Sequence, residues 1–137
     1  MKTAWWAIGT VLLTVAMTTL ALRRQRYKVK GQLMCEEEAA EATVKLVDED
    51  SGPDPDDTLD EGRTDRRGKF ELSGETTETS SIDPVLKIYT NCNDGWKPCE
   101  RKWKFELPDS YINGKTFDAG ILNLGMKLDD EERDCIH

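Results

Sequence analysis

The sequence predicts an all-β sandwich of about seven mainly antiparallel strands that is stapled by disulfide bonds. Short apolar segments alternate with polar residues at a period of two, and clusters of Gly, Pro and Asp separate these segments. Four cysteines in a chain of 137 residues predict the disulfides. No segment after residue 22 shows a sustained apolar stripe of helical period, so we expect no long helix.

Four segments have one apolar and one polar face, which is the pattern of a strand buried on one side. They are residues 27–35, 42–46, 69–72 and 102–107. Residues 85–89 are apolar on both faces, so we expect them to form the most buried strand.

The apolar positions change parity within residues 117–128. They are odd-numbered at Phe117, Ala119 and Ile121, and then even-numbered at Leu122, Leu124 and Met126. A β-bulge near Gly120 or Ile121 would produce this change. A last edge strand and an acidic tail are expected to follow.

Residues 1–21 have the features of a secretory signal peptide. Lys2 gives a basic head, residues 4–17 carry no charge, and Thr19 and Ala21 are small residues suited to cleavage. The alternative is a membrane anchor, because residues 4–22 are uncharged and arginines follow, although threonines and a glycine dilute the segment. We therefore expect one secreted, extracellular domain at residues 22–137.

The charge of the chain excludes general binding to nucleic acid. It contains 19 Lys plus Arg against 27 Asp plus Glu, a formal net charge of −8. Removing the leader deletes Lys2 and lowers that charge by one. A strongly negative protein repels a phosphate backbone, so we expect no nucleic-acid partner.

The four cysteines are Cys35, Cys92, Cys99 and Cys135, and an oxidising compartment would pair them in one of three ways. We favour Cys35 with Cys92, because each ends a predicted strand, and Cys99 with Cys135, which would tether the tail. A zinc site is not expected, because no two cysteines are two to four residues apart and the single histidine is His137.

An ordered set of short motifs resembles the nematode transthyretin-like family over nearly all of the chain after residue 29. The matching residues are Gly31, Cys35, Val44, Leu46, Asp50, Asp56, Asp57, Leu59, Asp60, Thr64, Asp65, Gly68, Phe70, Glu78, Asp83, Pro84, Cys92, Pro108, Tyr111 and Leu124. The resemblance implies a secreted, transthyretin-like (prealbumin-like) sandwich, in a family whose members mostly lack an assigned biochemical activity.

The same resemblance argues against catalysis. Transthyretin-fold enzymes that hydrolyse 5-hydroxyisourate use histidines and a C-terminal Tyr-Arg-Gly-Ser, whereas this chain has only His137 and ends Asp134-Cys135-Ile136-His137. Without an internal histidine, a Ser-His or Cys-His nucleophile pair is also missing. We expect a protein that is not an enzyme and that needs no cofactor.

Eight acidic residues crowd residues 48–61, and their oxygen atoms could hold Ca²⁺. The spacing is not that of an EF-hand, because no glycine follows an alternating acidic triplet directly. Pro53 and Pro55 stiffen the segment as an extended connector. A solvated acidic loop is the favoured interpretation, and no metal site is assigned.

Basic and aromatic residues are concentrated between residues 96 and 104. Trp96, Lys97, Arg101 and Lys102 are candidates for a surface that contacts anionic phospholipid. Under the alternative, which the net charge favours, Trp103 belongs to the core and the lysines form the solvent face of a strand.

We expect an extracellular binding protein that engages a cell-surface receptor or another protein. Its most specific form would recognise phosphatidylserine and bridge it to a receptor during cell clearance. The alternative is a carrier of a small apolar ligand, such as a lipid or a hormone-like molecule, in a pocket between subunits of an oligomer.

Overall fold

The computed structural model describes residues 22–49, 56–95 and 97–137. The predicted signal peptide at residues 1–21 and the candidate residue Trp96 lie outside these ranges. Among the residues described, no helix is long and apolar enough to cross a membrane.

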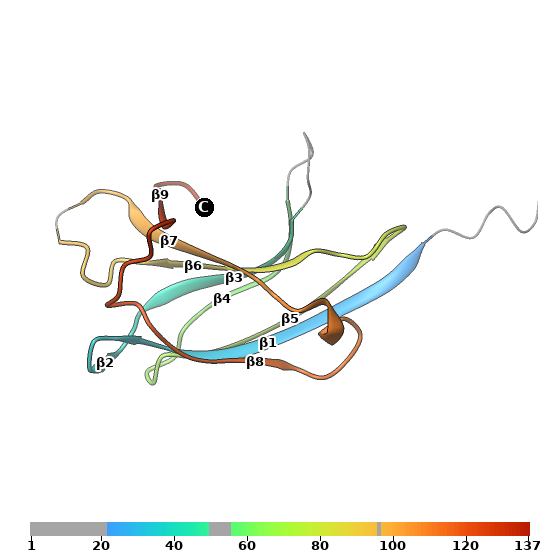
Figure 1. Cartoon of the computed structure of the whole chain (residues 1–137), viewed down its shortest axis with the longest axis horizontal. Coiled ribbons are helices and arrows are strands. Elements are labelled where there is room, and N and C mark those ends of the chain that lie inside the picture. The colour runs from blue at the N-terminus through green and yellow to red at the C-terminus, as the bar shows by residue number, and fades with distance from the viewer. Residues whose placement is uncertain (1–21, 50–55, 96) are drawn as a thin grey trace, which may run out of the picture.

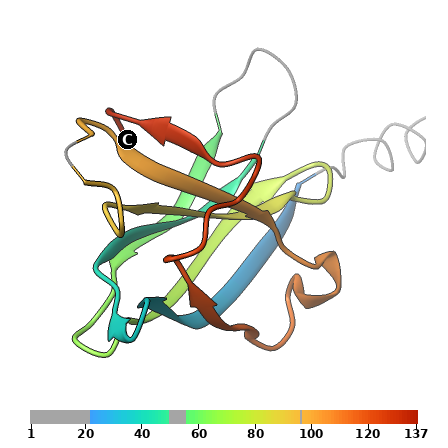
Figure 2. The same ribbon diagram turned by 60° about the vertical axis from the view of Figure 1, so that its left-hand side comes forward.

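The described chain forms two β-sheets that pack face to face (Figures 1 and 2). The elements are β1 (Arg23–Cys35), β2 (Glu38–Ala39), β3 (Ala42–Asp48), β4 (Asp57–Arg63), β5 (Lys69–Glu78), β6 (Pro84–Thr90), β7 (Glu100–Glu106), a 3-10 helix (Asp109–Tyr111), β8 (Phe117–Asn123) and β9 (Glu132–Asp134). Seven of these strands have at least seven residues, as predicted.

One sheet has four strands and the other has five. In the four-stranded sheet, β1 pairs with β2, β5 and β8, and β8 runs parallel to β1. The five-stranded sheet has the order β4-β3-β6-β7-β9, with antiparallel pairing throughout. The predicted all-β sandwich of mainly antiparallel strands is confirmed.

The core lies between the sheets and follows the predicted alternation. Tyr27, Val29 and Leu33 of β1 are fully buried, and β6 is the most buried strand, with six of its seven positions inaccessible. The Tyr27 hydroxyl donates a hydrogen bond to the Pro108 carbonyl at 2.8 Å, which fixes the connection between β7 and β8 to the core. Apolar burial of this kind drives the packing of the two layers.

The predicted bulge is present in β8. Along β1 the pairing advances two residues from Lys30 to Gln32, while along β8 it advances three, from Asp118 to Ile121. Gly120 has a φ of 77°, a conformation that favours glycine. Because the extra residue precedes Ile121, this side chain points outward and is 71% exposed, so its predicted inward position was wrong.

Strand β4 lies in the segment expected to be a solvated acidic loop. It is an edge strand, and its residues Asp57 to Arg63 pair with β3. Asp60 links β4 to β5 of the other sheet, because its Oδ2 accepts a hydrogen bond from the Ser73 amide at 2.9 Å. The remainder of that acidic segment, residues 50–55, is outside the described residues.

Candidate functional site

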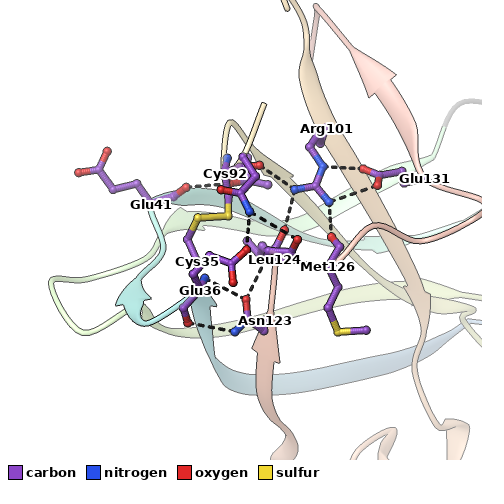
Figure 3. The surroundings of a disulfide bond; sticks show 12 residues. Cys35, Glu36, Glu41, Cys92, Arg101, Asn123, Leu124, Met126 and Glu131 are labelled. Carbon is purple, nitrogen blue, oxygen red and sulfur yellow. Dashed lines mark hydrogen bonds and ion pairs between the residues drawn. A yellow bond between two sulfur atoms is a disulfide. The ribbon is translucent and has the colours of Figure 1, made fainter. Parts of the chain in front are cut away.

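Arg101, a predicted lipid-contacting residue, is buried and structural. Its side chain is 1% exposed, and its guanidinium donates to the Glu131 carboxylate at 2.7 Å (Figure 3). The same group donates to the carbonyls of Cys92 at 2.7 Å, Leu124 at 2.6 Å, and Met126. The prediction that Arg101 lies on a membrane-facing surface was therefore wrong.

The other residues of the predicted lipid-contacting cluster do not form an exposed basic patch either. Lys102 is 15% exposed in its side chain and lies 3.7 and 3.9 Å from carboxylate oxygens of Glu132 and Asp134. Lys97 is exposed on the loop before β7. The structure thus separates Lys97 from a buried Arg101 and an ion-paired Lys102.

Three further lysines lie in one row across the outer face of the five-stranded sheet. Lys45, Lys87 and Lys104 are direct cross-strand partners on β3, β6 and β7. Like charges in such positions repel, and carboxylates offset the repulsion. Lys45 pairs with Glu61 at 3.2 Å, Lys87 pairs with Asp56 at 3.0 Å, and Lys104 pairs with Glu49. The positive charges of this lysine row are therefore neutralised by carboxylates of the protein itself.

His137 packs on the same face. Its ring stacks on the Tyr89 ring with a centroid distance of 4.0 Å, and its Nε2 lies 2.9 Å from the Glu100 carboxylate. Burial, and then the nearby carboxylates of Asp134 and Glu61, raise the pKa of Tyr89 to about 12. Tyr89 is therefore protonated at neutral pH and serves as a packing platform.

A second group of basic residues lies on the outer face of the four-stranded sheet, along β1. We call it the β1 basic strip, and it consists of Arg24, Arg26, Lys28 and Lys30, with Lys69 of β5 at its end. Their positions alternate with inward-facing residues of β1 such as Gln25 and Tyr27. Side chains two residues apart on a strand lie roughly 6.7 Å apart, so the strip is a continuous line of positive charge.

The β1 basic strip differs from the lysine row because none of its side chains forms an ion pair with any described residue. The carboxylates on the same face are those of Glu71, Glu75 and Asp118. Glu71 and Asp118 are cross-strand partners of Lys30, and Glu75 is the partner of Arg26. Five basic side chains thus face these three acidic ones and Asp65, which lines a groove together with Lys30 and Lys69, so this face has a small excess of positive charge on a negative protein.

An open groove of about 460 Å³ lies at one end of the β1 basic strip. Its lining includes the lysines Lys30 and Lys69, the carboxylates Asp65, Glu71 and Asp118, and the exposed Ile121. The groove therefore combines charged groups of both signs with an exposed apolar side chain.

The sequence contained a signal for this site. The alternation recognised from residue 27 onward extends back to Arg24, and this extension places four basic residues on one face. The arginines were instead considered only as the flank of a membrane anchor, and the strip was missed.

Three carboxylates at the C-terminal end of β3 could hold a metal ion. Asp48, Asp57 and Glu78 each present an oxygen within 4.8 Å of the other two. The first two belong to the acidic segment considered for Ca²⁺ from the sequence, and Glu78 belongs to β5.

All four cysteines are bridged, as Cys35–Cys92 and Cys99–Cys135, which is the pairing favoured from the sequence. The first bridge joins β1 of one sheet to the end of β6 in the other (Figure 3). The second joins the start of β7 to the tail after β9.

Comparisons with known proteins agree with this architecture. The model of the transthyretin-like family matches residues 30–108. Transthyretin-like proteins 33 and 5 of Caenorhabditis elegans are 43% and 44% identical to this chain, over 95% and 93% of its length and 95% and 97% of theirs. Transthyretin-like protein 46 of the same organism is 47% identical over 92% of this chain and 74% of its own. The family model covers more than half of the chain, and these relatives match nine-tenths or more of it, so the chain belongs to the transthyretin-like family.

Proposed function

We propose that this domain is an extracellular, non-enzymatic binding protein that attaches to anionic phospholipid through the β1 basic strip. The observation that carries the proposal is a line of basic side chains with no ion pairs to the described residues, on a chain whose net charge is −8. Cations that a fold does not neutralise internally remain available to an external anion.

The expected strength of the attraction is moderate. A Lys or Arg near an anionic bilayer contributes about 1 kcal/mol, so five residues contribute roughly 5 kcal/mol before the repulsion from Glu71, Glu75 and Asp118 is counted. Ile121 beside the strip can add apolar contact at head-group depth. Binding should therefore be reversible and should weaken with added salt.

A protein outside the cell would meet phosphatidylserine only where a cell exposes it, because the anionic lipids otherwise lie in the cytoplasmic leaflet. All four cysteines form disulfides, and such bonds persist in oxidising compartments. The outer face of the five-stranded sheet points away from the β1 basic strip, which leaves a second surface for a cell-surface receptor (Figure 1). A bridge between a lipid surface and a receptor needs two such separate faces.

Vesicle co-sedimentation tests this function with a matched pair of variants. Arg26→Gln with Lys30→Gln removes two charges from the β1 basic strip and should weaken binding to phosphatidylserine vesicles roughly 30-fold. Lys97→Gln with Lys127→Gln removes two exposed charges elsewhere, including one from the cluster predicted from the sequence, and should change binding little.

Variants that remove negative charge beside the strip complete the experiment. Glu71→Gln with Glu75→Gln removes repulsion beside the strip and should strengthen binding. Wild-type protein that ignores phosphatidylserine vesicles at low salt, or that binds phosphatidylcholine vesicles equally well, would rule out this function. If only the Lys97 and Lys127 variant lost binding, the lipid contact would lie at the loops before β7 and β9 instead.

A further inference from the structure

Three carboxylates meet at one end of the sandwich, at the junction of its two sheets. Asp48 ends β3, Asp57 begins β4, and Glu78 ends β5. Asp48 and Asp57 are direct cross-strand partners, and Glu78 comes from the other sheet. One oxygen from each side chain lies within 4.8 Å of the others. Like charges at this distance repel one another unless a cation or a proton compensates them.

Asp48 is incompletely satisfied although it is buried. The residue is 1% exposed, and its Oδ1 accepts a hydrogen bond from the Asp83 amide at 2.9 Å. Its Oδ2 is also buried and has no hydrogen-bond partner in the described part of the chain. A buried carboxylate oxygen without a partner is costly, so it indicates a ligand that completes it.

The basic residues nearest to this end are already engaged. Lys87 is bonded to Asp56, and Lys104 is bonded to Glu49. Neither Asp48 nor Asp57 takes part in an ion pair with another described residue. Arg23 of β1 is exposed and is the direct cross-strand partner of Glu78. The buried Asp48 and the exposed Asp57 therefore have no ion pair with a described basic residue.

We propose that Asp48, Asp57 and Glu78 bind a calcium ion that ties β3 and β4 to β5. Calcium takes six to eight oxygen ligands at about 2.3–2.6 Å, so oxygens on opposite sides of one ion lie about 4.6–5.2 Å apart. Three oxygens within 4.8 Å of each other fit around it. Magnesium usually keeps several waters and is seldom held in a site made of protein ligands alone, and zinc prefers nitrogen and sulfur ligands that this group lacks.

The expected affinity belongs to the extracellular range, a Kd of about 10⁻⁴ to 10⁻³ M. Three carboxylates supply up to six oxygens, and water can complete the shell. The bound ion would link strands of both sheets at the end of the sandwich that has no disulfide among the described residues.

Isothermal titration calorimetry of the full chain, first stripped with EDTA and then titrated with CaCl₂ without any lipid, tests this site. Wild-type protein should bind one Ca²⁺ saturably, more tightly than Mg²⁺. Asp57→Asn, which changes an exposed member of the group, should weaken binding at least about tenfold. Asp130→Asn, an exposed aspartate elsewhere, serves as the matched control and should bind as the wild type does.

Circular dichroism of each variant checks that the fold is intact, and Asp48→Asn gives a second reading of the same site. Absence of saturable binding at 10 mM Ca²⁺, roughly ten times the weakest expected Kd, would overturn the proposal. Unchanged binding by Asp57→Asn would also overturn it. Since no lipid is present, the result is independent of the function of the β1 basic strip.

Discussion

Two buried charged residues at opposite ends of the sandwich, Arg101 and Asp48, differ in how fully the protein satisfies their hydrogen bonds. At one end, Arg101 is 1% exposed and its guanidinium donates to the Glu131 carboxylate and three backbone carbonyls (Figure 3). At the other end, Asp48 is equally buried and has one oxygen without a partner. Equal burial therefore does not mean equal roles.

The difference has a physical basis in the desolvation of charge. Burying an ion is tolerated when its hydrogen bonds are replaced within the protein, and Arg101 meets that condition. Gln25 meets the same condition beside Asp48, because its amide donates to the Ser80 carbonyl and accepts from the Ile82 amide. Asp48 is thus the exception at its own end, which is why we interpret it as a ligand and not as a structural group.

The largest expected effect is on stability at the Arg101 end. Arg101→Met should lower the free energy of unfolding by about 3–5 kcal/mol, because it leaves Glu131 and three carbonyls without their partner. Urea denaturation measures the loss, with Lys97→Met as an exposed control expected within about 0.5 kcal/mol. A loss below about 1 kcal/mol for Arg101→Met would show that this end is not organised around Arg101.

A smaller effect should appear on acidification. The hydrogen bond from Arg101 lowers the pKa of Glu131 below its ordinary value of 4.5. A folded-state pKa below the unfolded one means that the stabilisation is fully present above pH 4.5 and is lost as the pH falls through the folded value. Denaturation midpoints followed downward from pH 6 should fall less steeply in Glu131→Gln than in the wild type. Parallel profiles would contradict the contribution of this pair.

The sequence predicted the layers of this fold because alternation records which side of a strand is buried. It placed Tyr27, Val29 and Leu33 correctly, and it identified β6 as the most buried strand. It missed β4, since an edge strand whose only large apolar residue is Leu59 carries almost no alternation. Pairing of its backbone with β3, rather than burial of its side chains, makes this segment a strand.

The functional surfaces were less accessible to prediction, for two different reasons. The alternation along β7 and β1 could have predicted the positions of Arg101 and of the β1 basic strip. Arg101 lies on the same inward face of its strand as Trp103, and Arg24 lies on the same outward face as Lys28. The group of three carboxylates could not be predicted, because Glu78 is 30 positions from Asp48 and meets it only through the packing of the two sheets. Long-range proximity of this kind depends on register, which a single sequence does not display.

The smallest expected effect on stability is at Asp48, and it sharpens the comparison most. In EDTA, Asp48→Asn should change the free energy of unfolding by less than about 1 kcal/mol or should raise it. The asparagine oxygen can still accept the Asp83 amide, its amide group can donate to a neighbouring carboxylate, and one of three clustered negative charges is removed. Urea denaturation in EDTA and in CaCl₂ should show that calcium stabilises the wild type and not this variant. If Asp48→Asn in EDTA were as costly as Arg101→Met, Asp48 would be a satisfied structural charge, and the two ends of the sandwich would not differ in the way argued here.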